Sequence, residues 1–453
     1  MCVARQGFML FILLIGMNEL YAQNYNTSFL GNWNDDNLVN HFVRYNDIWG
    51  YADQSGREYA IIGSRHFTHF IDVTNPESPI EVDRELGGTS CIWRDYKTFG
   101  QYLYGVSDQC NGGLEIFDLS YLPDSVHKVY DSDFFFNDAH NLFIDTARAK
   151  LYACGLDAGT TDLVILDLST SPDNPSLIKN LNLPEGYVHD LYVRNDTAYC
   201  SHIYTKKLIV YDLSDPENIQ SLGMYTSPGD NHSNWLSDNG DLLVLADETF
   251  DKDVMLLDMT NIEFPDTLST FRSTLLAPNH TNSIAHNPFF VGNSFIVMSY
   301  YDDGLQIFKL DSSMQVHQVG YYDTDTSNVS YSGIGAWGVY PFLPSGNLLV
   351  SDIEHGLFVV SPQFPLVDCN SNVLVQGKYD ISWNFISRDS LSIDAQLLNS
   401  ETYNLFAPNS VTLLPGFDIE NGTSLSVQIT DQCAVVSPLS GKRPLKPGNQ
   451  KEN

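Results

Sequence analysis

Four histidines recur at equivalent places in successive segments of the chain, namely His140, His189, His232 and His280. Each stands at or just before a short apolar run, and a carboxylate or amide side chain directly follows the first two. Neutral imidazole is the commonest metal ligand in proteins, and an adjacent carboxylate can orient it. The pattern therefore makes these four residues candidate ligands of a divalent metal ion.

The same pattern has a structural interpretation. A polar residue that lines a water-filled channel, or that bonds to a neighbouring repeat, is copied with the repeat for packing reasons alone. With an activated water, the four histidines would support a metal-dependent hydrolase or lyase reaction. We favour a structural or ligand-orienting role over catalysis and assign no catalytic residue.

Equivalent positions in the remaining segments carry other polar or aromatic residues. The complete set, with the residue that follows each, is Asn46-Asp47, Arg94-Asp95, His140-Asn141, His189-Asp190, His232-Ser233, His280-Thr281 and Trp337-Gly338. All of these are candidates for lining a ligand-binding channel. Arg94 would repel a metal ion, and it suits a carboxylate ligand or an ion pair with Asp47 or Asp95.

These residues open the copies of one repeated unit, which is clearest in residues 187–216, YVHDLYVRNDTAYCSHIYTKKLIVYDLSDP. The unit contains three short β-rich runs separated by turn residues, with a fourth run after it. Seven copies follow one another with a period of about 43 to 57 residues. This period predicts an all-β, seven-bladed β-propeller of four-stranded blades. The first strand of each blade lines the central channel, so the candidate residues would form a ring.

The ends of the chain are expected to differ from the repeats. Blade seven lacks an evident fourth strand, and Ser28–Trp33 would supply it and close the ring. We expect a propeller over residues 23–365, a small β domain over 366–435 and a disordered tail over 436–453. The small domain contains VTLLPGFDIENG and two strand-like runs, as in the β modules that end many secreted bacterial surface proteins.

Residues 1–22 read as a secretory signal peptide, with Arg5 before an apolar stretch too short to span a bilayer and Ala22 before the expected cleavage point. We expect an exported protein without a transmembrane span in its mature chain. A formal net charge of −33 over 453 residues argues against nucleic acid as a partner. It is compatible with a solvated acidic surface or with bound divalent cations.

Six cysteines remain once Cys2 leaves with the signal peptide, and an even number in an exported protein suggests disulfides. We expect the pairs Cys91–Cys110, Cys154–Cys200 and Cys369–Cys433. Six cysteines allow fifteen connectivities, and the sequence alone does not choose among them.

Several stretches resemble the choice-of-anchor B family, which is built from LVIVD repeats and regarded as β-propeller-like. They include NDIWGYADQSGREYAIIGS at Asn46, DAHNLFID at Asp138 and GAWGVYPFLPSGNLLVSDIEHGLFVV at Gly335. The resemblance covers about residues 40 to 361. It implies an exported or surface-attached protein and brings no established reaction. The chain departs from the family in blade two, where Asn111-Gly112-Gly113 replaces a His-Gly found in many members.

The sequence thus favours a secreted or cell-surface propeller that acts as a binding or scaffolding module. Its partner would be a protein, a glycan or a small molecule, and the sequence does not say which. The alternatives are the metal-dependent hydrolase or lyase centred on the histidine ring and an architectural spacer without a ligand.

Overall fold

The structure is a computed structural model. It describes residues 24–38, 43–88, 90–156, 159, 161–275, 284–326, 335–364, 366, 372–379, 383–386, 390–397, 402–407 and 410–429, with backbone only for 372–379, 383–386, 402, 404 and 406. The expected signal peptide, the C-terminal tail, His280, Thr281, Cys369 and Cys433 lie outside these residues. None of the described residues forms a helix that could cross a membrane.

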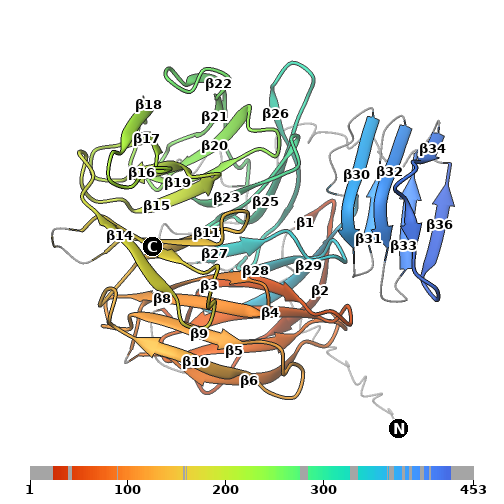
Figure 1. The fold of residues 1–453 in the computed structure, drawn as a ribbon, viewed down its shortest axis with the longest axis horizontal. Coiled ribbons are helices and arrows are strands. Elements are labelled where there is room, and N and C mark those ends of the chain that lie inside the picture. The colour runs from red at the N-terminus through yellow and green to blue at the C-terminus, as the bar shows by residue number, and fades with distance from the viewer. Residues whose placement is uncertain are drawn as a thin grey trace, which may run out of the picture.

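Seven antiparallel sheets are grouped around a common centre, and each sheet is one blade (Figure 1). Blades one to three comprise β3 (Tyr45–Ala52), β4 (Glu58–Ser64), β5 (Phe67–Asp72), β6 (Ile80–Leu86); β7 (Trp93–Phe99), β8 (Tyr102–Asp108), β9 (Leu114–Asp118), β10 (His127–Ser132); and β11 (Asn141–Asp145), β12 (Lys150–Cys154), β13 (Leu163–Asp167), β14 (Ser176–Leu181). Blades four and five comprise β15 (Asp190–Arg194), β16 (Thr197–His202), β17 (Lys207–Asp212), β18 (Gln220–Thr226); and β19 (Asn231–Leu236), β20 (Leu242–Asp247), β21 (Val254–Asp258), β22 (Asp266–Phe271). Blades six and seven contain β23 (Ala285–Val291), β24 (Phe295–Tyr300), β25 (Gly304–Leu310), β26 (Val316–Tyr322); and β27 (Ala336–Tyr340), β28 (Leu348–Asp352), β29 (Gly356–Pro362).

Burial along each blade follows the expected repeat. The second and third strands are buried almost throughout, as in β4 and β17, because both of their faces pack against neighbouring blades. The fourth strand alternates between exposed and half-buried residues, as in β10. A single blade cannot cover its own faces, so neighbouring blades share hydrophobic clusters, such as the one formed by Phe143, Tyr192 and Leu243 of blades three to five.

The N-terminal segment closes the ring, as the sequence predicts. Strand β2 (Thr27–Trp33) pairs antiparallel with β29 and becomes the fourth strand of blade seven. The preceding β1 (Asn24–Tyr25) adds a fifth strand to blade six by pairing with β26. The Thr27 hydroxyl donates to the carbonyl of Tyr321 at 2.6 Å and ties the two blades together. The N-terminal segment thus contributes the outer strand of both blade six and blade seven and links the two ends of the ring.

The C-terminal strands form a small β domain of a different kind, drawn in blue beside the propeller in Figure 1. They are β30 (Asn372–Tyr379), β31 (Trp383–Ile386), β32 (Ser390–Leu397), β33 (Thr402–Phe406), β34 (Ser410–Leu413), β35 (Asp418–Ile419) and β36 (Ser424–Gln428). Their pairing is parallel, with Asn372 opposite Ser390 and Ser390 opposite Ser410. The chain therefore coils with a step of about 20 residues and stacks successive turns.

The cysteines follow the expectation only in part. Cys91 and Cys110 form a disulfide, as predicted. Cys154 and Cys200 are buried free thiols, so the prediction that they pair is wrong. They occupy the same strand in neighbouring blades, and sheets packed face to face lie about 10 Å apart, whereas a disulfide needs Cα atoms within about 7 Å.

Candidate metal centre at the propeller axis

A collar of six aromatic rings surrounds one end of the axis. Its members are Trp93, His140, His189, His232, His286 and Trp337, and consecutive rings are close neighbours. The centroid distances are 4.3 Å for His140–His189, 4.4 Å for His189–His232, 4.5 Å for His232–His286 and 4.3 Å for both His286–Trp337 and Trp337–Trp93. Residues far apart in the sequence thus form one continuous aromatic arc, which we call the collar.

The side chains of the collar come from β-bulges and from the residues at the starts of the inner strands. The pairing of β19 with β20 shifts between Asn231 and Ser233, so His232 stands out of the ladder. The pairing of β27 with β28 shifts in the same way around Trp337. An unpaired bulge residue can redirect its side chain, which is why bulges recur next to functional sites. His189 instead immediately precedes β15, and its backbone N–H donates to the carbonyl of Ser201 at 2.8 Å.

Blade six contributes a different histidine from the expected one. Strand β23 begins at Ala285, and its ladder with β24 shifts between Ala285 and Pro288, which places His286 in the collar. The sequence alignment put His280 at this position, six residues too early. His280 itself lies outside the described residues. The repeat pattern does not distinguish the two histidines, because a polar residue follows each of them.

Two other residues that were expected in the ring, Arg94 and Asn46, are not part of the collar. Arg94 is buried and its guanidinium pairs with Glu115 at 3.3 Å and donates to the carbonyls of Ser64 and Gly87. Asn46 is buried and donates its amide to the carbonyl of Ile92 at 2.9 Å, which links blades one and two. Glu115 therefore neutralises the guanidinium of Arg94, which no longer counts against a metal site. Trp93 occupies the collar position of blade two.

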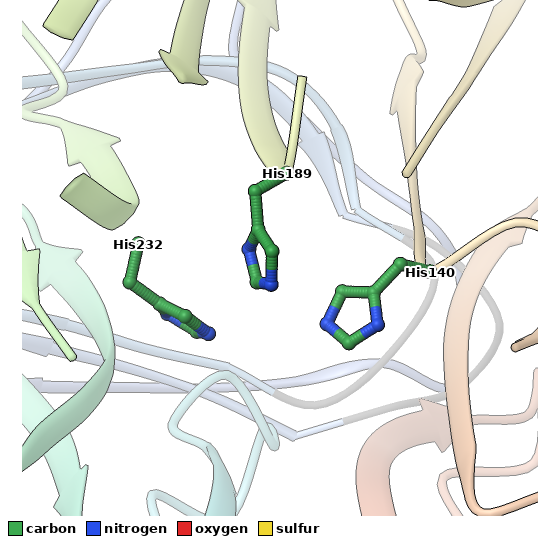
Figure 2. Close-up of side chains that lie close together, drawn as sticks. All are labelled: His140, His189 and His232. Atoms are coloured by element: carbon green, nitrogen blue, oxygen red, sulfur yellow. The ribbon is translucent and has the colours of Figure 1, made fainter. Parts of the chain in front are cut away.

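Three of the imidazoles are arranged as a candidate metal site. One nitrogen from each of His140, His189 and His232 lies within 4.8 Å of the other two. Figure 2 shows the three rings side by side, each from a different blade and facing a shared space. Zinc–nitrogen bonds of about 2.0–2.1 Å in a tetrahedral site place ligand nitrogens about 3.3 Å apart. The three nitrogens, within 4.8 Å of one another, lie in the range from which a bound ion would draw them together.

The protonation states suit metal binding. Burial lowers the pKa of His189 and of His232 well below the usual value, and the neighbouring histidines lower it further. Both imidazoles are therefore neutral near pH 7, and the Nδ1 atom of each is buried without a hydrogen-bond partner among the described residues. Burial also opposes the charged form of His140, but Asp108 outweighs it and raises the pKa of His140.

Asp108 fixes the tautomer of His140. Its Oδ2 lies 3.1 Å from Nδ1 of His140, and a carboxylate only accepts, so Nδ1 carries the proton. Nε2 of His140 then presents its lone pair. This carboxylate–histidine arrangement is the usual outer-shell support of a metal ligand.

A polar layer lies beneath the collar around a cavity of about 30 Å³. Five residues of the predicted second layer line this cavity, namely Asp47, Asp95, Asn141, Asp190 and Ser233. Asn287 stands in the place expected for Thr281, and Lys97 is the one cationic residue of the lining. The seventh predicted position is Gly338, where an added Cβ would meet Oδ1 of Asp47 at 2.9 Å. A space of this size holds water or an ion and is too small for an organic substrate.

The layer contains more carboxyl groups than cationic groups. Lys97 donates to Asp95 at 2.5 Å and lies 4.6 Å above the ring of Trp49. Asp47 and Asp190 also face this cavity, so three carboxyl groups share one ammonium. Burial, with the charge of Asp95, raises the pKa of Asp190 to about 7 and that of Asp47 well above its usual value. Such a layer favours a cation nearby over an anion.

Aromatic side chains form a floor below the polar layer. Trp49, Phe143, Trp235 and Phe289 line the lower part of the cavity, with Trp235 and Phe289 4.6 Å apart at their centroids. Phe342 packs on both of these rings. The described part of the axis is therefore a blind funnel, with the collar towards one face and apolar packing at the bottom.

The comparisons with known proteins bear on the fold alone. No family model matches the chain, and no curated protein matches it in sequence. Among solved structures, the chain is similar to a protein from Lactobacillus plantarum, a Northeast Structural Genomics Consortium target. The two are 13% identical, the alignment covers 63% of this chain and 84% of that one, and the TM-score is 0.50. This likeness agrees with the propeller architecture.

Several residues at the site escape the sequence reasoning. Trp93, Asp108, Glu248 and His286 all reach the collar, and only the first-strand positions were considered as ring members. A usable signal exists for two of them. Second strands end at the same face where first strands begin; β8 ends at Asp108, and Glu248 directly follows the end of β20 at Asp247. Acidic ends of second strands are therefore candidates for partnering the ring.

Proposed function

We propose that this chain is an exported, surface-associated β-propeller of the choice-of-anchor B type that acts as a metal-dependent binding module. In this proposal a divalent transition metal is held by His140, His189 and His232. The observation that carries it is the convergence of three imidazole nitrogens within 4.8 Å at the axis. Imidazole donors suit zinc, copper, iron and nickel.

The surroundings of the three histidines favour a metal over water alone. Buried nitrogens without hydrogen-bond partners are costly, and His189 and His232 each have one. A metal ion would bind lone pairs that the described residues leave unused. A bound cation would also favour the ionised form of Asp47 and Asp190, which line the cavity beneath with a single lysine.

Binding is supported better than hydrolysis or lyase chemistry. The axial cavity of about 30 Å³ leaves no room for an organic substrate below the collar, so a ligand would approach the metal from the collar face. Three protein ligands leave at least one coordination position for it. A protein, glycan or small molecule that offers an oxygen donor would fit that position.

Export is supported by the disulfide between Cys91 and Cys110, since such bonds persist in oxidising compartments. The free thiols Cys154 and Cys200 are buried and so protected from oxidation. Cell fractionation with N-terminal mass spectrometry tests this part. A mature chain that begins near Gln23 in the medium or on the cell surface would support export, and an intact Met1 in the cytosol would refute it.

Metal binding is tested by titrating Zn²⁺ into the full chain after chelator treatment, using calorimetry. We expect saturable binding that weakens in His140→Gln and His189→Gln by more than the roughly 100-fold that outer-shell changes cost. His317→Gln is the matched control, because this histidine is exposed and pairs with Asp311 at 2.8 Å. Equal affinity in the wild type and both collar variants would overturn the proposal.

A further inference from the structure

The geometry points to a second metal position on the far side of His232, held by His232, Glu248 and His286. One ligand atom from each of the three lies within 4.8 Å of the others. The site shares His232 with the proposed function, but it does not require the first position to be occupied. Two histidines and one carboxylate form a donor set that suits zinc or ferrous iron.

His286 has the tautomer and orientation of a metal ligand. Its Nδ1 lies 2.5 Å from the backbone carbonyl of Trp337, and a carbonyl only accepts, so Nδ1 carries the proton. The lone pair is therefore on Nε2, which is buried and has no hydrogen-bond partner among the described residues. The side chain is also fixed by ring contacts, since its centroid lies 4.7 Å from that of Tyr301. An oriented, unused nitrogen in a residue only 1% exposed is what a metal would satisfy.

Glu248 is held in place by a neighbour outside the triad. Its Oε1 accepts from the hydroxyl of Tyr301 at 2.6 Å, while its Oε2 lies 3.5 Å from Nε2 of His232. One oxygen is thus positioned and the other faces the two histidines. The side chain of Glu248 is only 29% exposed, so water compensates only part of the charge of its carboxylate. A cation between Glu248 and His286 would supply that compensation.

His232 stands between the two positions. Its Nε2 faces Glu248, and its Nδ1 is buried without a hydrogen-bond partner among the described residues. Its ring is also 4.4 Å from that of His189 on one side and 4.5 Å from that of His286 on the other. Two ions can bind at once only if His232 gives one nitrogen to each, which requires its ring N–H proton to be released to solvent. The imidazolate of His232 would then bridge the two ions.

The test measures stoichiometry with Zn²⁺ as the probe, by equilibrium dialysis of the chelator-treated full chain. We expect two equivalents in the wild type and one in Glu248→Gln and in His286→Gln. His140→Gln should also retain one, and His232→Gln should weaken both. Glu217→Gln is the matched carboxylate control, because this side chain is exposed and pairs only with Lys179 among the described residues.

The outcomes separate the two proposals. One equivalent that is lost in His140→Gln but kept in Glu248→Gln would refute the second position and leave the first. One equivalent lost in both variants would mean a single ion shared by the whole arc, which also refutes the second position. No binding at all would refute both.

A further variant keeps the test decisive if a ligand substitution prevents folding. Tyr301→Phe removes the hydroxyl that holds Glu248 but leaves every ligand in place. We expect it to lower the affinity of the second position by about 10-fold, the lower range for outer-shell partners, and to leave the first unchanged. Unchanged affinity at both positions would contradict the assignment.

Discussion

Trp93 and Trp337 lie face to face, with ring centroids 4.3 Å apart and planes only 8° from parallel. They come from blades two and seven, so the collar passes over blade one and closes through these two indoles. The equivalent residue of blade one, Asn46, instead donates a hydrogen bond to the backbone carbonyl of Ile92. The two indoles form an apolar half of the collar, which confines the nitrogen donors to the arc from His140 to His286.

The closing strand β2 makes a prediction about Gly31. A Cβ at this position would lie 2.2 Å from the backbone oxygen of Pro76 and 2.8 Å from Cδ of Pro79. We expect Gly31→Ala to lower the free energy of unfolding by about 1–3 kcal/mol, the usual cost of overpacking. Chemical denaturation measures it, with Ser28→Ala in the same strand as control. No loss of stability would contradict the close packing of β2 against Pro76 and Pro79.

The Cys91–Cys110 bond closes a loop with a sequence separation of 19. We expect Cys110→Ser to lower the free energy of unfolding by about 3 kcal/mol, chiefly because the unfolded chain gains freedom. Under reducing conditions the wild type should fall towards the variant. Cys200→Ala removes a free thiol and keeps the Cys91–Cys110 bond, so it should lose as much stability under reducing conditions as the wild type, whereas Cys110→Ser should not respond to reductant. A Cys200→Ala variant that no longer responds to reductant would contradict the structure.

The buried pair of Arg94 and Glu115 predicts a non-additive double substitution. Arg94→Met leaves the Glu115 carboxylate with Lys128, 2.8 Å away, and removes its buried partner. We expect this change to lower the free energy of unfolding by about 3–5 kcal/mol, and Arg94→Met with Glu115→Leu to lower it by less. Denaturant unfolding of both variants checks this. Additive losses would mean that the two groups do not interact.

Glu58 predicts a pH-dependent term in stability. Burial raises its pKa above 4.5, although the hydrogen bond from the Ser345 N–H opposes the shift. The folded state therefore holds this proton more tightly than the unfolded state, and its contribution to stability falls as pH rises from about 4.5 through the folded pKa. Relative to Glu58→Gln, the wild type should be more stable at pH 4 than at pH 7. A reversed trend in thermal unfolding would contradict this.

The architecture was predictable because the sequence contains seven copies of one unit. Seven apolar units that cannot cover their own faces must stack, and the missing strand of blade seven left Ser28–Trp33 as its only unassigned partner. Both inferences need only pattern and the cost of open edges. The Cys91–Cys110 bond was within reach for a similar reason, since the two residues flank one blade's first hairpin.

The identity of the collar residues was less predictable, because β-bulges determine which side chains reach the axis. A bulge adds a residue without changing the repeat, so the alignment chose His280 where β23 places His286. Strand alternation decides between Trp93 and Arg94, and a one-residue shift exchanges the axis for the blade interface. Asp108 ends the second strand of its blade and Glu248 directly follows one, so an acidic residue at this place in the repeat was the available signal for both.

Anomalous diffraction at the zinc absorption edge, from crystals of the zinc-loaded full chain, tests the metal centre most directly. The account predicts a peak about 2.0–2.1 Å from one nitrogen each of His140, His189 and His232. A collar without an anomalous peak, whose imidazole nitrogens contact only water or backbone carbonyls, would contradict it.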